Sequence, residues 1–200
     1  MYKRQVVTDS VTSDGLHEYL ENTLGDTHYR YRRGYKNVIN KAQELCQKGI
    51  DCPLAIETSG HAALRENYFL DDGAYLVTKI VIELARGKDI EEILKPLKAP
   101  AEEKECRFNI LCDDFKAYGN TVIDELTKYA ESRPDYKIAS DNREGVRIST
   151  ENGFFLLRLS VHDPVMPMNF ESNVKGGIKK DIDGIRGFFE RFKELDISSL

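Results

Sequence analysis

The sequence predicts two successive domains: an α/β domain with a mostly parallel sheet covered by helices, and a small α+β domain with an antiparallel sheet and helices on one face. Three observations predict this. Strand-like and helix-like segments alternate in the first half, strands follow one another between two helices in the second half, and a charged stretch containing a proline separates them. We therefore expect domains at 1–97 and 106–200, joined by a linker over 98–105.

In the first domain, β-branched or apolar runs indicate strands, and apolar residues spaced three or four apart indicate helices. The expected strands cover 5–11, 27–33 and 54–56, and the expected helices end near 25, 48 and 85, with a short helix over 90–97. Gly25 and Gly49 stand where glycine commonly ends a helix. Parallel strands bind ligands beyond their carboxyl ends, which is where Glu57 and the turn Arg33-Gly34-Tyr35 lie.

In the second domain, a strand and a helix come first and further strands follow. The expected strands and extended segments cover 106–112, 136–139, 145–149, 154–160 and 168–171, and the expected helices cover 113–131 and 173–195. The first of these helices begins with an aspartate, a residue that commonly caps helices. Strands enclosed by a helix at each end predict an antiparallel sheet with two helices on one face.

The composition restricts the class of protein. The chain has 200 residues, a formal net charge of −5 and 40% hydrophobic residues, which is typical of a soluble globular protein. Its longest apolar stretch, 74–85, contains Thr78, Lys79 and Glu83 and is too short to span a membrane. Residues 1–4 lead directly into an expected strand, so we expect no secretion leader and a cytoplasmic location.

The charges and the cysteines argue against a nucleic-acid partner and against disulfide or metal-binding cysteines. The acidic balance argues against a nucleic-acid partner, and the one basic cluster considered, Arg30, Arg32 and Arg33, suits a small anion better than a polymer. The four cysteines have no Cys-x-x-Cys spacing, so we expect them to be reduced and to bind no metal. These cysteines are Cys46, Cys52, Cys106 and Cys112.

The densest polar chemistry follows the expected strand at 54–56. Glu57-Thr58-Ser59-Gly60-His61 supplies a carboxylate, two hydroxyls, a glycine and an imidazole in five residues, and an apolar helix begins soon after Asp71-Asp72-Gly73. A polar cluster at the end of a strand is a candidate binding site. The alternative for Glu57 and Ser59 is a helix-cap and turn network that binds nothing.

Glu57-Thr58-Ser59-Gly60-His61, followed by Asp72-Gly73, resembles the sugar-binding loop of the α-D-phosphohexomutases, the phosphomannomutase and phosphoglucomutase family. The family loop is commonly Gly-Glu-x-Ser-Gly-His, and Ile56 replaces its first glycine. The resemblance implies that Glu57 and Ser59 hold sugar hydroxyls and that His61 supports them or faces a phosphate. It also implies possible roles for Arg33 and Lys36, since Arg32-Arg33-Gly34-Tyr35-Lys36 stands where the family often has a Gly-His-Lys turn. For Lys36, a solvated position in the first turn of a helix is the alternative.

A second resemblance follows the apolar strand at 154–157. Arg158-Leu159-Ser160-Val161-His162-Asp163-Pro164 is similar to the family's phosphate-binding loop, commonly Arg-Pro-Ser-Gly-Thr-Glu-Pro. It implies that Arg158 and Ser160 bind phosphate, a role that suits a planar guanidinium and a hydroxyl. His162 could replace part of the charge that is lost where Pro167 stands for a basic residue of the family. A structural salt bridge is the alternative for Arg158.

The resemblance covers the third and fourth domains of the family. It implies the substrate-binding C-terminal portion of a phosphohexomutase, which interconverts hexose 6-phosphate and hexose 1-phosphate through a phosphoserine and a bisphosphorylated sugar. The catalytic serine and the Asp-x-Asp-x-Asp loop for Mg²⁺ are expected in N-terminal catalytic domains of the same protein, and no catalytic or metal-binding residue is expected in this chain.

Two other classes of protein remain open. A stand-alone phosphosugar-binding module without catalysis would have the same sequence features. A two-domain interaction protein whose motif matches are accidental would bind no hexose phosphate, so its thermal stability would not respond to one. The sequence does not decide which hexose is preferred.

Overall fold

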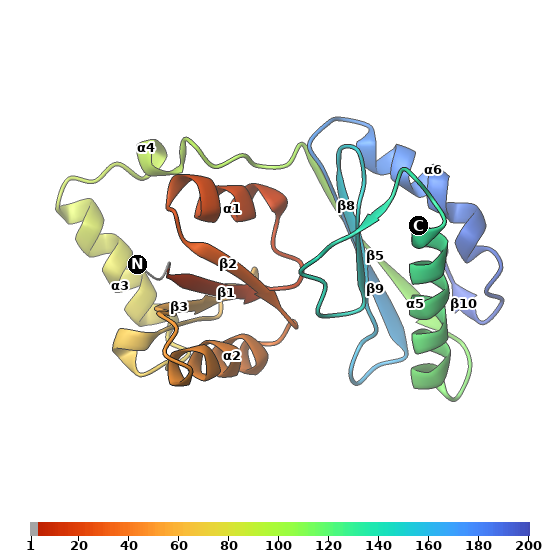
Figure 1. The fold of residues 1–200 in the computed structure, drawn as a ribbon, viewed down its shortest axis with the longest axis horizontal. Helices are drawn as coiled ribbons and strands as arrows, with labels where there is room; N and C mark the ends of the chain where they lie inside the picture. The colour runs from red at the N-terminus through yellow and green to blue at the C-terminus, as the bar shows by residue number, and fades with distance from the viewer. Residues whose placement is uncertain (1–3) are drawn as a thin grey trace. The chain divides into compact units, whose positions relative to one another are not determined.

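A computed structural model describes residues 4–200; residues 1–3, expected to precede the first strand, lie outside the described residues. The chain divides into two compact units, unit 1 up to Ala99 and unit 2 from Pro100 to Leu200 (Figure 1). Each unit is described by itself.

Unit 1 is built on a four-stranded sheet with the order β2-β1-β3-β4. The strands are β1 (Gln5–Asp9), β2 (Thr27–Tyr31), β3 (Leu54–Ile56) and β4 (Ala62–Leu64). β1 lies parallel to both β2 and β3, which confirms the expected parallel arrangement. The antiparallel strand β4 was not expected, because it lies within the polar stretch and pairs with β3 through the tight turn between them.

Helices of unit 1 lie on both sides of this sheet (Figure 1). They are α1 (Asp14–Glu18) with the π-helix η1 (Tyr19–Thr23), α2 (Tyr35–Gln47), the 3₁₀-helix η2 (Arg65–Asn67), α3 (Gly73–Ala85) and α4 (Ile90–Leu94). The Ser13 hydroxyl caps α1 by accepting the Leu16 N–H at 3.0 Å. The apolar residues Val38, Ala42 and Leu45 of α2 form a buried cluster with Val7 and Ala55 of the sheet.

Helix α3 has the most apolar sequence of these helices, yet none of its side chains is buried. Val77 and Val81 are 58% and 55% exposed, and Ile80, Ile82 and Leu84 are also exposed. Among the described residues, burial of apolar side chains therefore contributes little to the stability of α3. Its first turn is fixed by Asp72, whose carboxylate accepts the Tyr75 N–H at 2.9 Å.

Unit 2 has a six-stranded antiparallel sheet with the order β10-β5-β9-β8-β7-β6. The strands are β5 (Glu102–Ile110), β6 (Lys137–Ile138), β7 (Val146–Ser149), β8 (Gly153–Leu157), β9 (Val165–Ser172) and β10 (Leu195–Asp196). Helices α5 (Phe115–Glu131) and α6 (Gly177–Phe189) pack on one face of the sheet, as expected (Figure 1). Asp114 caps α5 through the Ala117 N–H at 3.1 Å.

Several boundaries in unit 2 differ from the expected ones, and pairing between distant strands explains two of them. β5 begins at Glu102, inside the segment expected to be a linker, because residues 102–105 pair with residues 169–172 of β9. α6 ends at Phe189 rather than near 195, because Leu195 pairs with Ile110 in the added edge strand β10. In both places pairing with a distant segment overrides the local pattern.

The core of unit 2 lies between the sheet and the two helices. Phe108 and Phe189 are fully buried, with ring centroids 5.1 Å apart, and Leu126 of α5 is buried beside them. Burial of each such side chain contributes about 1.5–3 kcal/mol. In the part of the chain that the structure describes, no helix combines the length and the apolar character needed to cross a bilayer.

Candidate functional site

Polar groups meet at the carboxyl ends of the three parallel strands of unit 1. Glu57, directly after β3, is only 7% exposed. Its Oε1 accepts the Gly34 N–H at 2.5 Å, and its Oε2 accepts the Ser59 hydroxyl at 3.4 Å. The strand-end positions expected for Glu57 and Gly34 are therefore brought together, and the carboxylate has a fixed orientation.

A tight turn presents the residues that follow Glu57. The Gly60 N–H donates to the Glu57 carbonyl and the Glu57 N–H donates to the His61 carbonyl, both at 2.9 Å. Gly60 has φ +92°, a value that other residues rarely adopt, so the turn depends on this glycine. Thr58, Ser59 and His61 are exposed. A buried carboxylate with exposed hydroxyl and imidazole groups beside it can accept and donate hydrogen bonds to a polyhydroxylated ligand.

Asp9 is a member of this cluster that the sequence motifs did not indicate. It is fully buried at the end of β1. Its Oδ2 accepts both the N–H and the hydroxyl of Thr58, at 3.2 and 2.7 Å, and its Oδ1 accepts the Thr12 hydroxyl at 2.9 Å. The position could have been found from the strand-end rule, because β1 is the central parallel strand and Asp9 is its last residue.

His61 is fixed on two sides. Its Nδ1 lies 2.7 Å from Asp71 Oδ2, and its ring stacks on Tyr35 with centroids 5.1 Å apart. Tyr35 begins α2, and Lys36 beside it is exposed with its ammonium 5.9 Å from the Tyr35 ring. Arg33 is half-buried, and its carbonyl accepts the Asn37 side-chain N–H at 2.7 Å. Basic side chains therefore occur on the turn whose Gly34 contacts Glu57.

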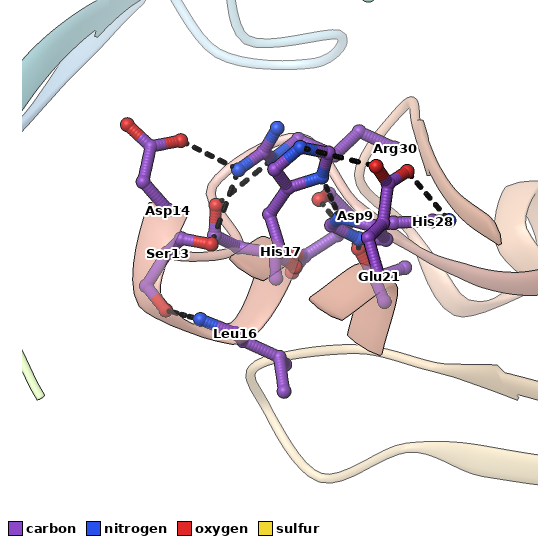
Figure 2. A network of polar contacts seen from close by, with 10 residues as sticks. Asp9, Ser13, Asp14, Leu16, His17, Glu21, His28 and Arg30 are labelled. Carbon is purple, nitrogen blue, oxygen red and sulfur yellow. Dashed lines mark hydrogen bonds and ion pairs between the residues drawn. The ribbon is translucent and has the colours of Figure 1, made fainter. Parts of the chain in front are cut away.

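A second polar network supports the cluster from the α1 side of the sheet (Figure 2). The Arg30 guanidinium, 5% exposed, donates to the Thr12 and Ser13 carbonyls and forms an ion pair with Asp14 at 2.7 Å. Because Thr12 also donates to Asp9, hydrogen bonds run from β2 through the α1 loop to the Thr58 turn. This network fixes the segment that carries Glu57.

Two histidines complete the network (Figure 2). His17 Nδ1 and His28 Nδ1 lie 3.0 Å apart, and His28 Nε2 lies 2.7 Å from the Thr8 hydroxyl. The His28 backbone N–H donates to Glu21 Oε1 at 3.3 Å. These contacts join α1 and η1 to β1 and β2 through polar groups, whereas helices usually pack on a sheet through apolar side chains. The position of α1 and η1 on the sheet therefore depends on the geometry of these hydrogen bonds.

In unit 2 the sequence-predicted phosphate loop connects β8 and β9. Arg158 and Ser160 are half-buried, and His162 is exposed. The Arg158 N–H donates to the Pro167 carbonyl at 3.1 Å and the Ser160 N–H donates to the Val165 carbonyl at 2.9 Å, so the loop continues the hairpin. The Ser160 hydroxyl accepts the Asp163 N–H at 3.3 Å.

Arg158 lies close enough to Glu105 for its charge to affect that carboxyl. Burial alone would raise the pKa of Glu105, but a hydrogen bond from Asn169 and the positive charges of Arg107 and Arg158 lower this pKa overall. Arg107, paired with Glu105 at 2.8 Å and itself largely exposed, was not indicated by the loop motif. It occurs near Arg158 because β5 and β8 both pair with β9, a relation that no local motif encodes.

The residues present do not fit a magnesium site. Among the described residues, no group of three or more His, Cys, Asp or Glu side chains could hold a metal ion. The adjacent aspartates have other partners, since Asp71 bonds His61 while Asp72 and Asp114 cap α3 and α5. No step of a mechanism is therefore assigned to a metal here.

The fold and the strand-end cluster define an α/β domain with a polar site at the carboxyl edge of its sheet, followed by an antiparallel α+β domain. Residues 1–99 match the family described as phosphoglucomutase/phosphomannomutase, alpha/beta/alpha domain III. A phosphoglucomutase of Neisseria meningitidis is 30% identical over 128 residues, which are 64% of this chain and 27% of that protein. A phosphoglucomutase of Neisseria gonorrhoeae is 27% identical over a stretch of the same length.

Solved structures agree in fold with both units. A phosphoglucomutase/phosphomannomutase family protein from Burkholderia thailandensis has a TM-score of 0.74 at 23% identity, over 95% of this chain and 38% of that one. Aspergillus fumigatus N-acetylphosphoglucosamine mutase, solved with GlcNAc-6P and magnesium, has a TM-score of 0.56 at 10% identity, over 92% of this chain and 38% of that one. The chain belongs to the α-D-phosphohexomutase family, and it matches just over a quarter of the length of the curated relatives.

Proposed function

We propose that this chain is the substrate-binding C-terminal portion of a phosphohexomutase, an isomerase that interconverts hexose 6-phosphate and hexose 1-phosphate. The observation that carries the proposal is the Glu57 carboxylate, held by Gly34 beside the exposed Ser59 within the residues that match the family. On this proposal, phosphoryl transfer through a phosphoserine and a bisphosphorylated sugar takes place on N-terminal catalytic domains, where Mg²⁺ is also bound.

The proposed sugar ligands are Glu57, Ser59 and His61. A carboxylate accepts hydrogen bonds from two neighbouring sugar hydroxyls, and a charged acceptor makes these bonds stronger than neutral ones. Within residues 4–200, Glu57 Oε2 accepts only the long 3.4 Å bond from Ser59, so a sugar hydroxyl can replace that contact. Asp71 and Tyr35 orient His61 toward the same ligand.

The proposed phosphate ligands are Arg158, Ser160 and His162, with Arg33 and Lys36 as possible further cations. A guanidinium offers two parallel donors to phosphate oxygens, and a hydroxyl adds a third. The domain roles proposed are sugar binding in 1–97 and phosphate binding in 106–200.

Calorimetric titration of this chain with glucose 1-phosphate and glucose 6-phosphate tests the proposal. We expect weak binding that falls about tenfold in Ser59→Ala and in Arg158→Ala, the loss of one good polar contact in each. Two variants of matched chemistry serve as controls and should bind as the wild type does: Thr78→Ala on exposed α3, and Arg133→Ala, whose guanidinium pairs with Asp135.

The proposal fails if no binding is measured at millimolar ligand, either for this chain or after the N-terminal domains of a phosphohexomutase are added. Binding that is unchanged in both loop variants would likewise overturn the assignment of the two loops. Three hexoses are candidates for the substrate: glucose, mannose and an amino sugar. Competition titrations with their phosphates rank the affinity of the chain for each.

The second candidate is a stand-alone phosphosugar-binding module, located, like the mutase, in the cytoplasm. It would have the same sequence features as the substrate-binding portion of a mutase. Both candidates bind hexose phosphates, so binding does not separate them. Mutase activity that appears on combination with the N-terminal domains, and that Arg158→Ala reduces, would establish the first candidate.

A further inference from the structure

Two thiols that take no part in the proposed sugar site lie at one turn of unit 1. Cys46 belongs to the last turn of α2, and Cys52 precedes β3. The Cys46 thiol donates to the Cys52 carbonyl at 3.3 Å, and the Cys52 thiol contacts the Leu54 carbonyl at 3.8 Å. Both side chains pack in the same apolar cluster under α2. The chain between them therefore returns on itself and places both cysteines together.

The backbone of this turn allows the two residues to approach. The Gly49 N–H donates to the Cys46 carbonyl and the Ile50 N–H donates to the Leu45 carbonyl, both at 3.0 Å, which ends α2 and reverses the chain. Gly49 has φ +78°, and no atom lies within 4 Å of where a Cβ would stand. The reversal therefore needs glycine for its positive φ and not for the close approach of another atom.

The environments of the two thiols differ. Cys46 is half-buried, whereas Cys52 is fully buried, and burial raises the pKa of the Cys52 thiol to about 12. Arg65 lies against this pair. Its pKa is raised by hydrogen bonds to Asp51, which it meets at 2.7 Å, and to the Cys46 thiol. The Asp51 carboxylate therefore holds the guanidinium beside the half-buried Cys46 thiol.

We propose that Cys46 and Cys52 form a peroxide-reactive thiol pair in which Cys46 is oxidised first and Cys52 closes a disulfide. In the first step the Cys46 sulfur attacks hydrogen peroxide: an S–O bond forms, the O–O bond breaks, and the leaving hydroxide takes the thiol proton as water. Arg65 donates hydrogen bonds to the peroxide oxygens, which stabilises the charge on the leaving group. The product is a sulfenic acid.

In the second step the Cys52 sulfur attacks the sulfenic sulfur of Cys46. The S–S bond forms, the S–O bond breaks, and the hydroxyl leaves with the Cys52 proton as a second water. Two electrons pass in total from the two sulfurs to the peroxide, so the reaction is balanced with peroxide as the only oxidant. The Cys52 thiol lies in the same cluster and is shielded from peroxide itself, so it acts as the resolving group, and its raised pKa makes this second step the slower one.

Treatment of the full chain with hydrogen peroxide, followed by alkylation of remaining thiols and peptide mapping, tests this proposal. We expect a linked Cys46–Cys52 peptide two hydrogen atoms lighter than the reduced form, and its loss on addition of a thiol reductant. Cys106, which is buried in unit 2, serves as an internal control and should remain reduced. Arg65→Gln should slow the linkage several-fold, while Arg86→Gln, which alters another exposed ion pair, should not.

A further variant traps the intermediate. In Cys52→Ser the reaction should stop at the Cys46 sulfenic acid, which a dimedone probe labels once. If this variant does not fold, as judged by circular dichroism, peptide mapping of the wild-type chain alone decides. The proposal is overturned if peroxide leaves Cys46 and Cys52 reduced, if Cys46 proceeds to the sulfinic acid without linkage, or if Cys112 pairs in place of either.

Discussion

Single buried residues carry the geometry of the strand ends in unit 1. Asp9 is fully buried and accepts three hydrogen bonds, two of them from Thr58. Glu57 is fixed by Gly34 in the same region. A buried group with satisfied hydrogen bonds holds one conformation, because any other conformation leaves a polar atom without a partner. The exposed hydroxyl of Ser59 therefore owes its position to the buried carboxylates of Asp9 and Glu57.

Asp9→Asn tests this dependence. The amide replaces one acceptor oxygen with a donor that faces other donors, so we expect the free energy of unfolding to fall by about 1–3 kcal/mol. Denaturant titration followed by circular dichroism measures the change. Glu91→Gln on exposed α4 is the control and should change stability little. An Asp9→Asn variant as stable as the wild type would show that the Thr58 contacts contribute nothing.

Asp181 gives unit 2 a pH dependence of known sign. Burial raises the pKa of this carboxyl, partly opposed by the Thr150 hydroxyl, which donates to it at 3.3 Å. Because the folded pKa lies above the unfolded value, the folded state retains the proton longer, and this contribution to stability is lost as pH rises through the folded pKa. At neutral pH the charged carboxylate therefore destabilises unit 2.

Asp181→Asn should stabilise unit 2 at neutral pH, and the gain should shrink as the pH falls through the raised pKa of the folded protein, where the wild-type carboxyl takes up its proton. Urea midpoints of both proteins across this range measure the difference. Asp183→Asn, an exposed neighbour on the same helix, should show no such trend. A gain for Asp181→Asn that is constant with pH would contradict the effect of burial.

At the scale of elements, α3 differs from the other long helices. α2, α5 and α6 each bury an apolar face, whereas α3 buries none. A lysine at an exposed apolar position should therefore be tolerated: we expect Val77→Lys and Val81→Lys to change unfolding free energy by less than about 0.5 kcal/mol and to reduce binding of an apolar dye. Val38→Lys on α2, at a position only 1% exposed, is the contrasting variant and should unfold unit 1.

The turn between β6 and β7 depends on Gly145. Its φ is +57°, and a Cβ there would stand 2.0 Å from the Leu157 carbonyl oxygen. Gly145→Ala should therefore destabilise unit 2 by more than about 1 kcal/mol, through both strain and overlap. Gly49 also has a positive φ, but a Cβ there would meet no other atom. Gly49→Ala therefore measures the cost of backbone strain without the cost of overlap. Thermal unfolding of both variants separates the two causes; equal losses would exclude the overlap.

At the scale of the whole molecule, each unit has its own apolar cluster. The cluster of unit 2 contains Phe108, Leu126 and Phe189, whereas that of unit 1 relies on small residues such as Ala42 and Ala55. Larger buried side chains remove more apolar surface from water. We therefore expect fragment 100–200 to fold alone and to be more stable than fragment 1–99.

Leu126→Ala tests the core of unit 2 in that fragment and in the full chain. Truncation of a fully buried leucine should cost about 3 kcal/mol, including the cavity it leaves. Leu111→Ala removes the same side chain where it is 63% exposed and should be close to neutral. Denaturant unfolding measures both. A similar loss for the two variants would show that burial does not determine the cost.

The sequence by itself predicted the order of the helices and of every strand except β4 and β10, because caps and apolar spacing act within a few residues. Gly49 follows the end of α2 as predicted, and the cap of α5 is Asp114, one residue after the expected start at Asp113. The family and the two-part fold were also predicted from local motifs. The roles of Glu57 and Arg158 in binding remain predictions, although the strand-end position of Glu57 is as expected.

Only the tertiary structure decided which distant segments pair. Strand β4, the early start of β5 and the edge strand β10 all depend on partners far along the chain. The same holds for Asp9 beside Thr58, for Arg107 near Arg158 and for the exposure of α3. The physical reason is that hydrogen bonding and burial are satisfied by whichever groups the fold brings close, and a local pattern contains no information about them.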